Sequence, residues 1–136
     1  TRVACYPNES VHTSDERITM GDARDEERAL YLREGLKAAD ATRLGDDHIA
    51  LELEFMQALA ARSLACASGD EADDGTRWRE TLDVQAAFLN DHLLNWVPAF
   101  ADLMADSAQT DFYRGLAAML AAFLRDDRAF VEELRN

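Results

Sequence analysis

The chain passes from a loop into its clearest helix over residues 44–56, which read Leu44-Gly45-Asp46-Asp47-His48-Ile49-Ala50-Leu51-Glu52-Leu53-Glu54-Phe55-Met56. Apolar residues recur at the steps of three and four that mark one helix face, at Ile49, Leu53, Met56, Ala60 and Leu64. Asp46 or Asp47 can accept hydrogen bonds from the free amides of the first turn. Ser68-Gly69 stops the pattern. A helix is therefore predicted from about Asp46 to Ala67.

The remaining sequence predicts further helices and no strand. Only 2 Pro and 6 Gly occur among 136 residues, whereas helix formers such as Ala, Leu, Glu and Arg are frequent. Residues 1–21 show no sustained period and are expected to form a loop with one short turn at most. The other predicted helices are about Asp25–Ala39, Thr76 to a break at Pro98, Pro98–Met104, Thr110–Arg125 and Asp127–Leu134. The predicted fold is all-α, one domain over residues 1–136 built as a bundle of about five helices.

The helix predicted over residues 110–125 carries two apolar rows. One row holds Phe112, Leu116, Met119 and Phe123, and the other holds Tyr113, Leu120 and Leu124. Two rows imply contact on two sides, which predicts a central position for this helix. Aromatic side chains are expected in the core, at Trp78, Phe88, Trp96, Phe100, Phe112 and Tyr113.

Composition limits the function classes. The chain has 27 acidic and 14 basic residues, a formal net charge of -13, which argues against a nucleic-acid partner. The same charge suits a basic ligand, although solubility alone explains it equally well. No run of about 18 apolar residues occurs, so no stable membrane insertion is expected. Two cysteines, Cys5 and Cys66, do not make a disulfide framework, and a reducing cytoplasm is the simpler expectation.

Four polar residues lie on otherwise apolar helix faces: His48, Glu52, Gln85 and His92. A buried carboxylate needs a partner, and His48 lies one turn before Glu52 on the same side. The two can satisfy each other, or His48 can serve a function at the loop edge. Gln85 and His92 are expected to form a buried pair that fixes the helix register. His12, in the first loop, is expected to be exposed.

Signatures of catalysis or metal binding are missing from the sequence. The Glu-x-x-His motif of di-iron bundles does not occur, because Gly45 and Leu89 stand three residues before His48 and His92. Neither His-Glu-x-x-His nor Cys-x-x-Cys is present, and there is no phosphate-binding loop. We therefore expect no catalytic residue, no metal site and no cofactor.

Four segments together resemble the TorD/DmsD family of redox-enzyme maturation chaperones. The first is Tyr6-Pro7-Asn8-Glu9-Ser10-Val11, similar to a Tyr-Glu-Ser-Val loop of that family. The second and most specific is Asp47-His48-Ile49 with Glu52-Leu53-Glu54-Phe55-Met56, similar to its Asp-His hinge motif and the helix after it. The third runs from Gln85 to Phe100 with Phe88, Leu89, His92, Leu93 and Trp96. The fourth is Phe112-Tyr113 followed by Phe123-Leu124.

The chain departs from the family pattern in two ways. Leu44 and Gly45 stand where the family usually has Glu and Pro before the hinge. The helices that normally precede the Tyr-Glu-Ser-Val loop are missing, and Thr1 is not Met, so we expect the C-terminal part of a longer chain. Uncovered apolar helix faces would then favour a homodimer, with exchange of helices between chains as one route.

The resemblance implies a cytoplasmic chaperone and not an enzyme. Its expected partners are the precursor of a molybdopterin-containing oxidoreductase and the twin-arginine signal peptide of that precursor, which it would bind before cofactor insertion and export. The expected peptide-binding residues are Asp47 and His48, with Glu9 and Ser10 on the adjoining loop. Asp47 or Glu9 could pair with an Arg of the peptide, and His48 could bond its backbone.

Two other functions fit the sequence. One is an acidic helical adaptor or regulatory module that dimerises through its apolar faces and has no signal-peptide role. The other is a metal-dependent helical enzyme that uses His48, Glu52 and His92.

Overall fold

The computed structural model describes residues 5–19, 21–37, 41–69, 72 and 75–136. Within these ranges every regular element is a helix, which confirms the predicted all-α fold. The elements are α1 (Glu9–Thr13), α2 (Asp22–Arg33), α3 (Ala41–Leu44), α4 (Ile49–Ser68), α5 (Thr76–Phe88), the π-helix η1 (Leu89–Leu93), α6 (Leu94–Ser107) and α7 (Asp111–Arg135).

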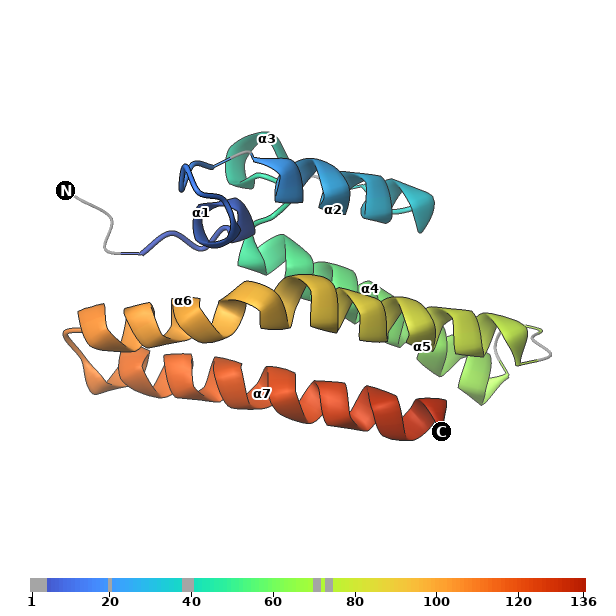
Figure 1. The fold of residues 1–136 in the computed structure, drawn as a ribbon. Coiled ribbons are helices and arrows are strands. Elements are labelled where there is room, and N and C mark those ends of the chain that lie inside the picture. The colour runs from blue at the N-terminus through green and yellow to red at the C-terminus, as the bar shows by residue number, and fades with distance from the viewer. Residues whose placement is uncertain (1–4, 20, 38–40, 70–71, 73–74) are drawn as a thin grey trace.

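The helices are arranged in layers, as Figure 1 shows. The elements α5, η1 and α6 follow one another without a break and form one long rod, with α4 packed antiparallel to α5 on one side. The last helix, α7, runs back along α6 and α5 on another side, and the short α1 to α3 region lies across α4 and α6. The core thus forms where α4, the rod and α7 meet, with Leu59, Leu89, Leu93, Trp96 and Val97 almost wholly buried.

The helix predicted from about Asp46 to Ala67 agrees well with α4, whereas the first predicted helix has other bounds. Gly69 ends α4 in the left-handed region, at φ 76°, as its sequence position predicts. The loop predicted over residues 1–21 contains the short helix α1. The first predicted helix begins earlier, at Asp22, and ends at Arg33, so its C-terminal part is not helical; its predicted last residue, Ala39, lies outside the described residues.

Pro98 does not end the long rod. It lies in the first part of α6, which continues to Ser107, although the proline ring removes one helical N–H donor. The irregular part of the rod is instead η1, immediately before α6. A π-turn adds a residue to the helix, and such turns occur frequently at functional sites.

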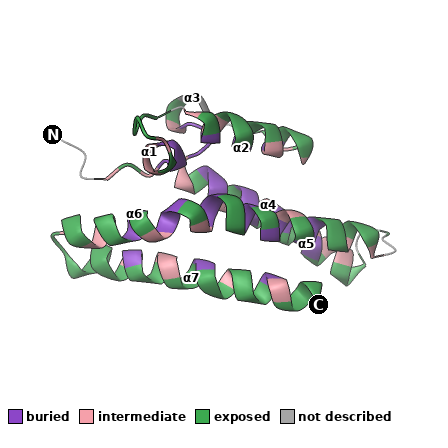
Figure 2. Ribbon diagram, in the orientation of Figure 1, coloured by how far each residue is buried: buried purple, intermediate pink, exposed green. Residues whose placement is uncertain are grey.

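The helix α7 is also different from the prediction. Residues 111–135 form one helix, not two, and α7 lies at the edge of the bundle, not at its centre. Figure 2 shows that its outer side is exposed along most of its length. The exposed apolar side chains are Phe112, Tyr113, Met119, Phe123, Phe130 and Leu134. Phe112 and Tyr113, which were expected in the core, are thus on the surface. Of the two predicted rows, the one with Phe112, Met119 and Phe123 is largely exposed, whereas Leu124 of the other row is buried.

Gln85 is buried as predicted, but its partner is a different residue. Its side-chain amide donates to Ser63 Oγ across the α4–α5 contact, at 2.9 Å. His92 points to another part of the core, so the predicted Gln85–His92 pair is wrong. None of the helices among the described residues combines the length and the apolar character that crossing a lipid bilayer demands.

Candidate functional site at the Asp-His corner

Two segments far apart in the sequence meet at the start of α4. The Glu9 amide donates to the Asp47 carbonyl oxygen at 3.0 Å, and the Ile49 amide donates to the Pro7 carbonyl oxygen at 2.9 Å. These bonds form an isolated antiparallel bridge between Asn8 and His48. The two motifs singled out in the sequence, residues 6–11 and 47–49, therefore form one structure, which we call the Asp-His corner.

Asp47 holds this corner together with its side chain. Its Oδ2 accepts from the Ser10 amide at 2.9 Å, and its Oδ1 accepts from Asn8 Nδ2 at 3.3 Å. Because Ser10 is in the first turn of α1, the carboxylate of Asp47 caps that helix from another segment. Asp47 is 0% exposed and makes bonds of the charge-assisted kind.

The chain can turn into the corner because of Gly45, whose φ is 80°. A Cβ atom there would lie 3.0 Å from Asp47 Oδ1. Proline, which the resembling family usually has at this position, is restricted to a φ near -65°. A proline could not take the backbone conformation that Gly45 has here.

His48 is the N-cap residue of α4, a role that the sequence prediction gave to Asp46 or Asp47. Its Nδ1 accepts from the Ala50 amide at 3.1 Å, so Nδ1 carries no proton in this arrangement. Burial lowers the pKa of His48, although the Asp47 charge acts in the opposite direction. A neutral His48, partly exposed at the edge of the corner, thus remains available to a ligand through its other ring nitrogen.

Glu52 is fully buried and does not pair with His48. Both of its oxygens accept from Trp96 Nε1, at 3.1 and 3.2 Å. Burial raises the pKa of Glu52 well above its ordinary value, and the charges of Glu27 and Glu9 raise it further. The predicted His48–Glu52 pair is therefore wrong, although the prediction that Glu52 has a structural partner holds.

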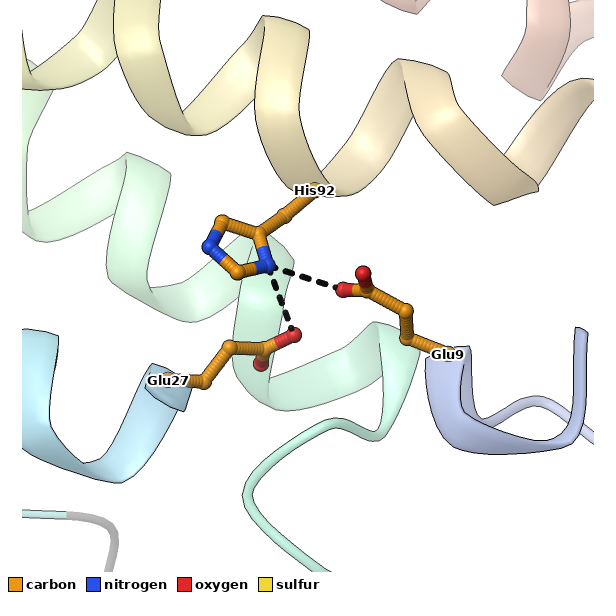
Figure 3. Close-up of side chains that lie close together, drawn as sticks. All are labelled: Glu9, Glu27 and His92. Atoms are coloured by element: carbon orange, nitrogen blue, oxygen red, sulfur yellow. Dashed lines mark hydrogen bonds and ion pairs between the residues drawn. The ribbon is translucent and has the colours of Figure 1, made fainter. Parts of the chain in front are cut away.

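Behind the corner lies a polar cluster that the sequence did not predict, formed by Glu9, Glu27 and His92. Figure 3 shows the three side chains pointing toward one another from α1, α2 and η1. His92 Nδ1 lies 3.0 Å from Glu9 Oε2 and 3.5 Å from Glu27 Oε1. Burial opposes the charge on His92, but the hydrogen bonds and charges of Glu27 and Glu9 outweigh it and raise its pKa to about 10.

Glu27 is held by Tyr31 as well as by His92. The Tyr31 hydroxyl lies 2.8 Å from Glu27 Oε2 and 2.8 Å from the Asp46 carbonyl oxygen. Tyrosine has one proton, so it cannot donate to both acceptors at once. Burial raises the pKa of Glu27 to about 8, with Glu9 acting in the same direction and the bonds from His92 and Tyr31 opposing. If Glu27 is protonated, its own O–H can donate to the Tyr31 hydroxyl, and the Tyr31 proton then goes to the Asp46 carbonyl oxygen.

His12 was predicted to be an exposed loop residue, but it packs against α6. Its ring stacks on Trp96 with a centroid distance of 5.2 Å and meets Phe100 edge-on at 5.8 Å. Its Nε2 lies 2.8 Å from the Tyr6 carbonyl oxygen, to which it can donate. His12 therefore fastens α1 to α6.

An apolar groove of about 480 Å³ begins beside the corner, between α4, α6 and α7. Its lining consists of Ile49, Leu53, Phe100, Met104, Leu116, Met119, Leu120 and Phe123, a set with no polar surface. Ile49 directly follows His48, so the groove starts where the corner ends. Met119 and Phe123 are 62% and 54% exposed, which leaves the α7 wall open to a partner.

The predicted peptide-binding residues are thus brought together but are not equally accessible. Asp47, Glu9 and Ser10 are buried, and only His48 is partly exposed. Contact between these residues and a peptide remains a prediction. The metal-binding set proposed from the sequence, His48 with Glu52 and His92, is wrong. Among the described residues, the group whose ligand atoms converge is Glu9, Glu27 and His92.

Comparison with known proteins connects this architecture with one family. The model of the family described as "Nitrate reductase delta subunit" matches residues 1–102. A protein of Vibrio cholerae serotype O1 named "Chaperone protein TorD" is 28% identical over 133 residues, 98% of this chain and 57% of its own length. A protein of the same name from Photobacterium profundum is 39% identical over 125 residues, 92% of this chain and 55% of its own.

The chain spans a little over half the length of these curated relatives. No solved structure matches it. The family match covers residues 1–102, which include the corner, the polar cluster and most of the rod, and the chain therefore belongs to the nitrate reductase delta subunit family, in agreement with the TorD/DmsD resemblance of its motifs.

Proposed function

We propose that this chain acts in the cytoplasm as a chaperone for a molybdopterin-containing oxidoreductase, and not as an enzyme. The observation that carries the proposal is membership of the nitrate reductase delta subunit family, with relatives named "Chaperone protein TorD" aligned along 98% and 92% of the chain. Such a protein would bind the twin-arginine signal peptide of the precursor and hold the apoenzyme until its cofactor is inserted.

The apolar groove is the surface that suits such a peptide. A twin-arginine signal peptide presents two Arg residues beside an apolar stretch, and an apolar groove would take that stretch as a helix or an extended segment. Asp127 follows Phe123 by four residues on the same face of α7, so its carboxylate lies one turn beyond the groove. The net charge of -13 would further attract a basic ligand.

The residues of the Asp-His corner would then have two different roles. His48, at the edge of the groove, would bond the peptide backbone. Asp47 and Ser10 bond each other and would hold the corner in shape, while Glu9 fastens α1 to His92. A direct bond from Asp47 or Glu9 to an Arg of the peptide would require the corner to open.

The test is a titration of a fluorescent twin-arginine peptide with the purified protein and two variants. Phe123→Glu places a charge in the groove, and we expect it to weaken binding at least about tenfold, or about 1.4 kcal/mol. Phe130→Glu is the matched control, since Phe130 is 57% exposed on the same helix but does not line the groove. Equal affinity of both variants and wild type would contradict the groove as the site.

A second titration tests the charge contact. Asp127→Asn is expected to weaken binding of the twin-arginine peptide more than binding of a peptide in which both Arg are Gln. The reason is that the Asn variant lacks the carboxylate that pairs with Arg. The same loss with both peptides would rule out Asp127 as the Arg partner. His48→Ala should weaken binding of both peptides equally, because the His48 side chain is proposed to bond the peptide backbone.

The acidic adaptor remains a second candidate because of the uncovered apolar side of α7. An adaptor would dimerise or bind partners through that side without regard to a signal peptide. The two functions separate in a pull-down of one oxidoreductase precursor with and without its leader. A chaperone of the proposed kind retains only the precursor that carries the leader, whereas an adaptor treats both alike.

A further inference from the structure

The polar cluster of Glu9, Glu27 and His92 has the composition and spacing of a metal site. Its three ligand atoms all lie within 4.8 Å of one another, and all three residues are buried. Ligand atoms bound about 2.0–2.1 Å from one ion lie roughly 3.0–3.4 Å apart. The distances from His92 Nδ1 to the two carboxylates, 3.0 and 3.5 Å, are close to that range.

One ligand atom of the cluster has no hydrogen bond. Glu27 is 0% exposed, and its Oε1 has no hydrogen bond; His92 Nδ1 lies 3.5 Å from it, as an ion-pair neighbour. The other oxygen, Oε2, is held by the Tyr31 hydroxyl, so Oε1 is turned toward His92 and Glu9. Tyr31 thus has the position of the outer partner that usually orients a metal-binding carboxylate. A buried acceptor without a donor is unfavourable, and a cation would relieve it.

Without a metal ion, the charges of the cluster balance only when one of its carboxyl groups keeps its proton. His92 contributes one positive charge at most, against the carboxyl groups of Glu9 and Glu27, with Glu52 near enough to add to their field. A divalent ion bound by a neutral imidazole would balance two carboxylates.

One member of the cluster borders an open pocket. His92 lines a pocket of about 540 Å³ between α2, α4 and the rod, whose charged lining residues are Glu26, Asp91 and Arg33. His92 lies in η1, lines this pocket and points its Nδ1 toward the two carboxylates (Figure 3).

We propose that Glu9, Glu27 and His92 bind one divalent transition-metal ion of the class that accepts imidazole and carboxylate ligands, such as Zn²⁺, Mn²⁺ or Fe²⁺. An imidazole ligand favours these ions over Mg²⁺ and Ca²⁺, which prefer oxygen. The ion would tie α1, α2 and η1 together and so stabilise the Asp-His corner from behind. The three ligands are far apart in the sequence, so no short sequence motif predicts the site.

The experiment starts from the purified protein, freed of metal with a chelator, into which Zn²⁺ is titrated by calorimetry. We expect one equivalent to bind and to raise Tm, since a ligand that binds the folded state stabilises it. Glu27→Gln and His92→Gln should each lower the Zn²⁺ affinity at least about tenfold, as for a lost ligand. Asp91→Asn, on the pocket rim next to His92, is the matched control and should bind like wild type. Mg²⁺ should not compete.

A second measurement covers the case in which a variant fails to fold. Co²⁺ is added to the wild-type protein, and its visible spectrum must show binding that Zn²⁺ displaces, with X-ray absorption reporting nitrogen and oxygen ligands. The proposal is overturned if the wild-type protein binds neither ion, or if folded Glu27→Gln and His92→Gln bind as tightly as wild type. Loss of peptide binding alone would not bear on this site, because the groove lies outside the cluster.

Discussion

Two regions of this bundle, the interior beneath α1 and α2 and the outer side of α7, carry the opposite of what their positions usually demand. Beneath α1 and α2 the interior holds Glu9, Glu27, Asp47, Glu52 and His92, whereas the outer side of α7 shows large apolar residues to solvent. Soluble monomers usually bury apolar groups and pair or expose charged ones. The difference teaches that the two regions have different tasks. The buried polar groups fix one arrangement of the chain, and the open apolar side provides a surface for something else to cover.

The polar side depends on mutual bonds, so removal of one member should be costly. Asp47→Ala removes the side-chain acceptor of the Ser10 amide and one of the two acceptors of Asn8 Nδ2, which also donates to the Leu44 carbonyl oxygen. We expect a loss of about 3 kcal/mol in the free energy of unfolding, measured with urea. Asp91→Ala, an exposed Asp on the rod, should change it by less than about 0.5 kcal/mol. Equal effects of the two substitutions would mean that Asp47 does not hold the corner.

Because of Glu27 and His92 in this region, the free energy of unfolding of the metal-free protein should fall as the pH rises. The pKa of Glu27 is raised from 4.5 to about 8, so the folded state retains a proton that the unfolded state loses, and stability falls between these values. The pKa of His92 is raised from 6.5 to about 10, so its contribution is complete below 6.5 and is lost as the pH rises through 10. Urea unfolding with a chelator present should show stability falling by more than about 1 kcal/mol from pH 6.5 to 9.

The Glu27→Gln variant provides the control for this pH dependence. It cannot ionise, so its stability should fall less steeply between pH 4.5 and 8 than that of wild type. A wild-type curve that rises over this range would contradict the assignment of both groups.

Glu52 offers a milder change within the same interior. Glu52→Gln keeps an oxygen that can accept from Trp96 Nε1 and removes a carboxyl whose ionisation is opposed by burial. We expect the unfolding free energy at pH 7 to stay within about 1 kcal/mol of wild type, while Glu52→Ala lowers it by about 2 kcal/mol or more. If Gln were as harmful as Ala, the charge of Glu52 and not its bond to Trp96 would be the essential feature.

The smallest effect on stability is expected on the apolar side. Met119→Glu alters a side chain that is 62% exposed and should change the unfolding free energy by no more than about 0.5 kcal/mol. It should nevertheless lower any self-association seen by sedimentation, because it places a charge in the open face of α7. A large loss of stability would show that this face is covered within the chain itself.

Local patterns predicted the elements that depend on local rules. The apolar period and Ser68-Gly69 predicted most of α4. The Asp-His motif and the Tyr-Pro-Asn-Glu-Ser loop, which the sequence singled out separately, bond directly to each other. Their direct pairing could not be predicted, because nothing in either segment states that the Glu9 amide bonds the Asp47 carbonyl.

The errors share a physical cause, which is tertiary contact. Pro98 loses one donor but remains helical within a packed rod, and α7 continues through Asp126-Asp127 where the sequence suggested a new start. Glu52 was assigned to the nearest basic residue on its own helix, yet its donor is Trp96, 44 positions away. The apolar rows of α7 predicted contact on two sides and a central helix, but among the described residues only the row with Leu124 packs into the core.

Hydrogen–deuterium exchange tests the central claim most directly, with the protein measured alone and after addition of a twin-arginine signal peptide. The account predicts slower exchange in α7 and α6 along the apolar groove and at the first turn of α4, with little change in α2. Protection confined to α2 and η1, or no protection at a peptide concentration that saturates binding, would contradict it.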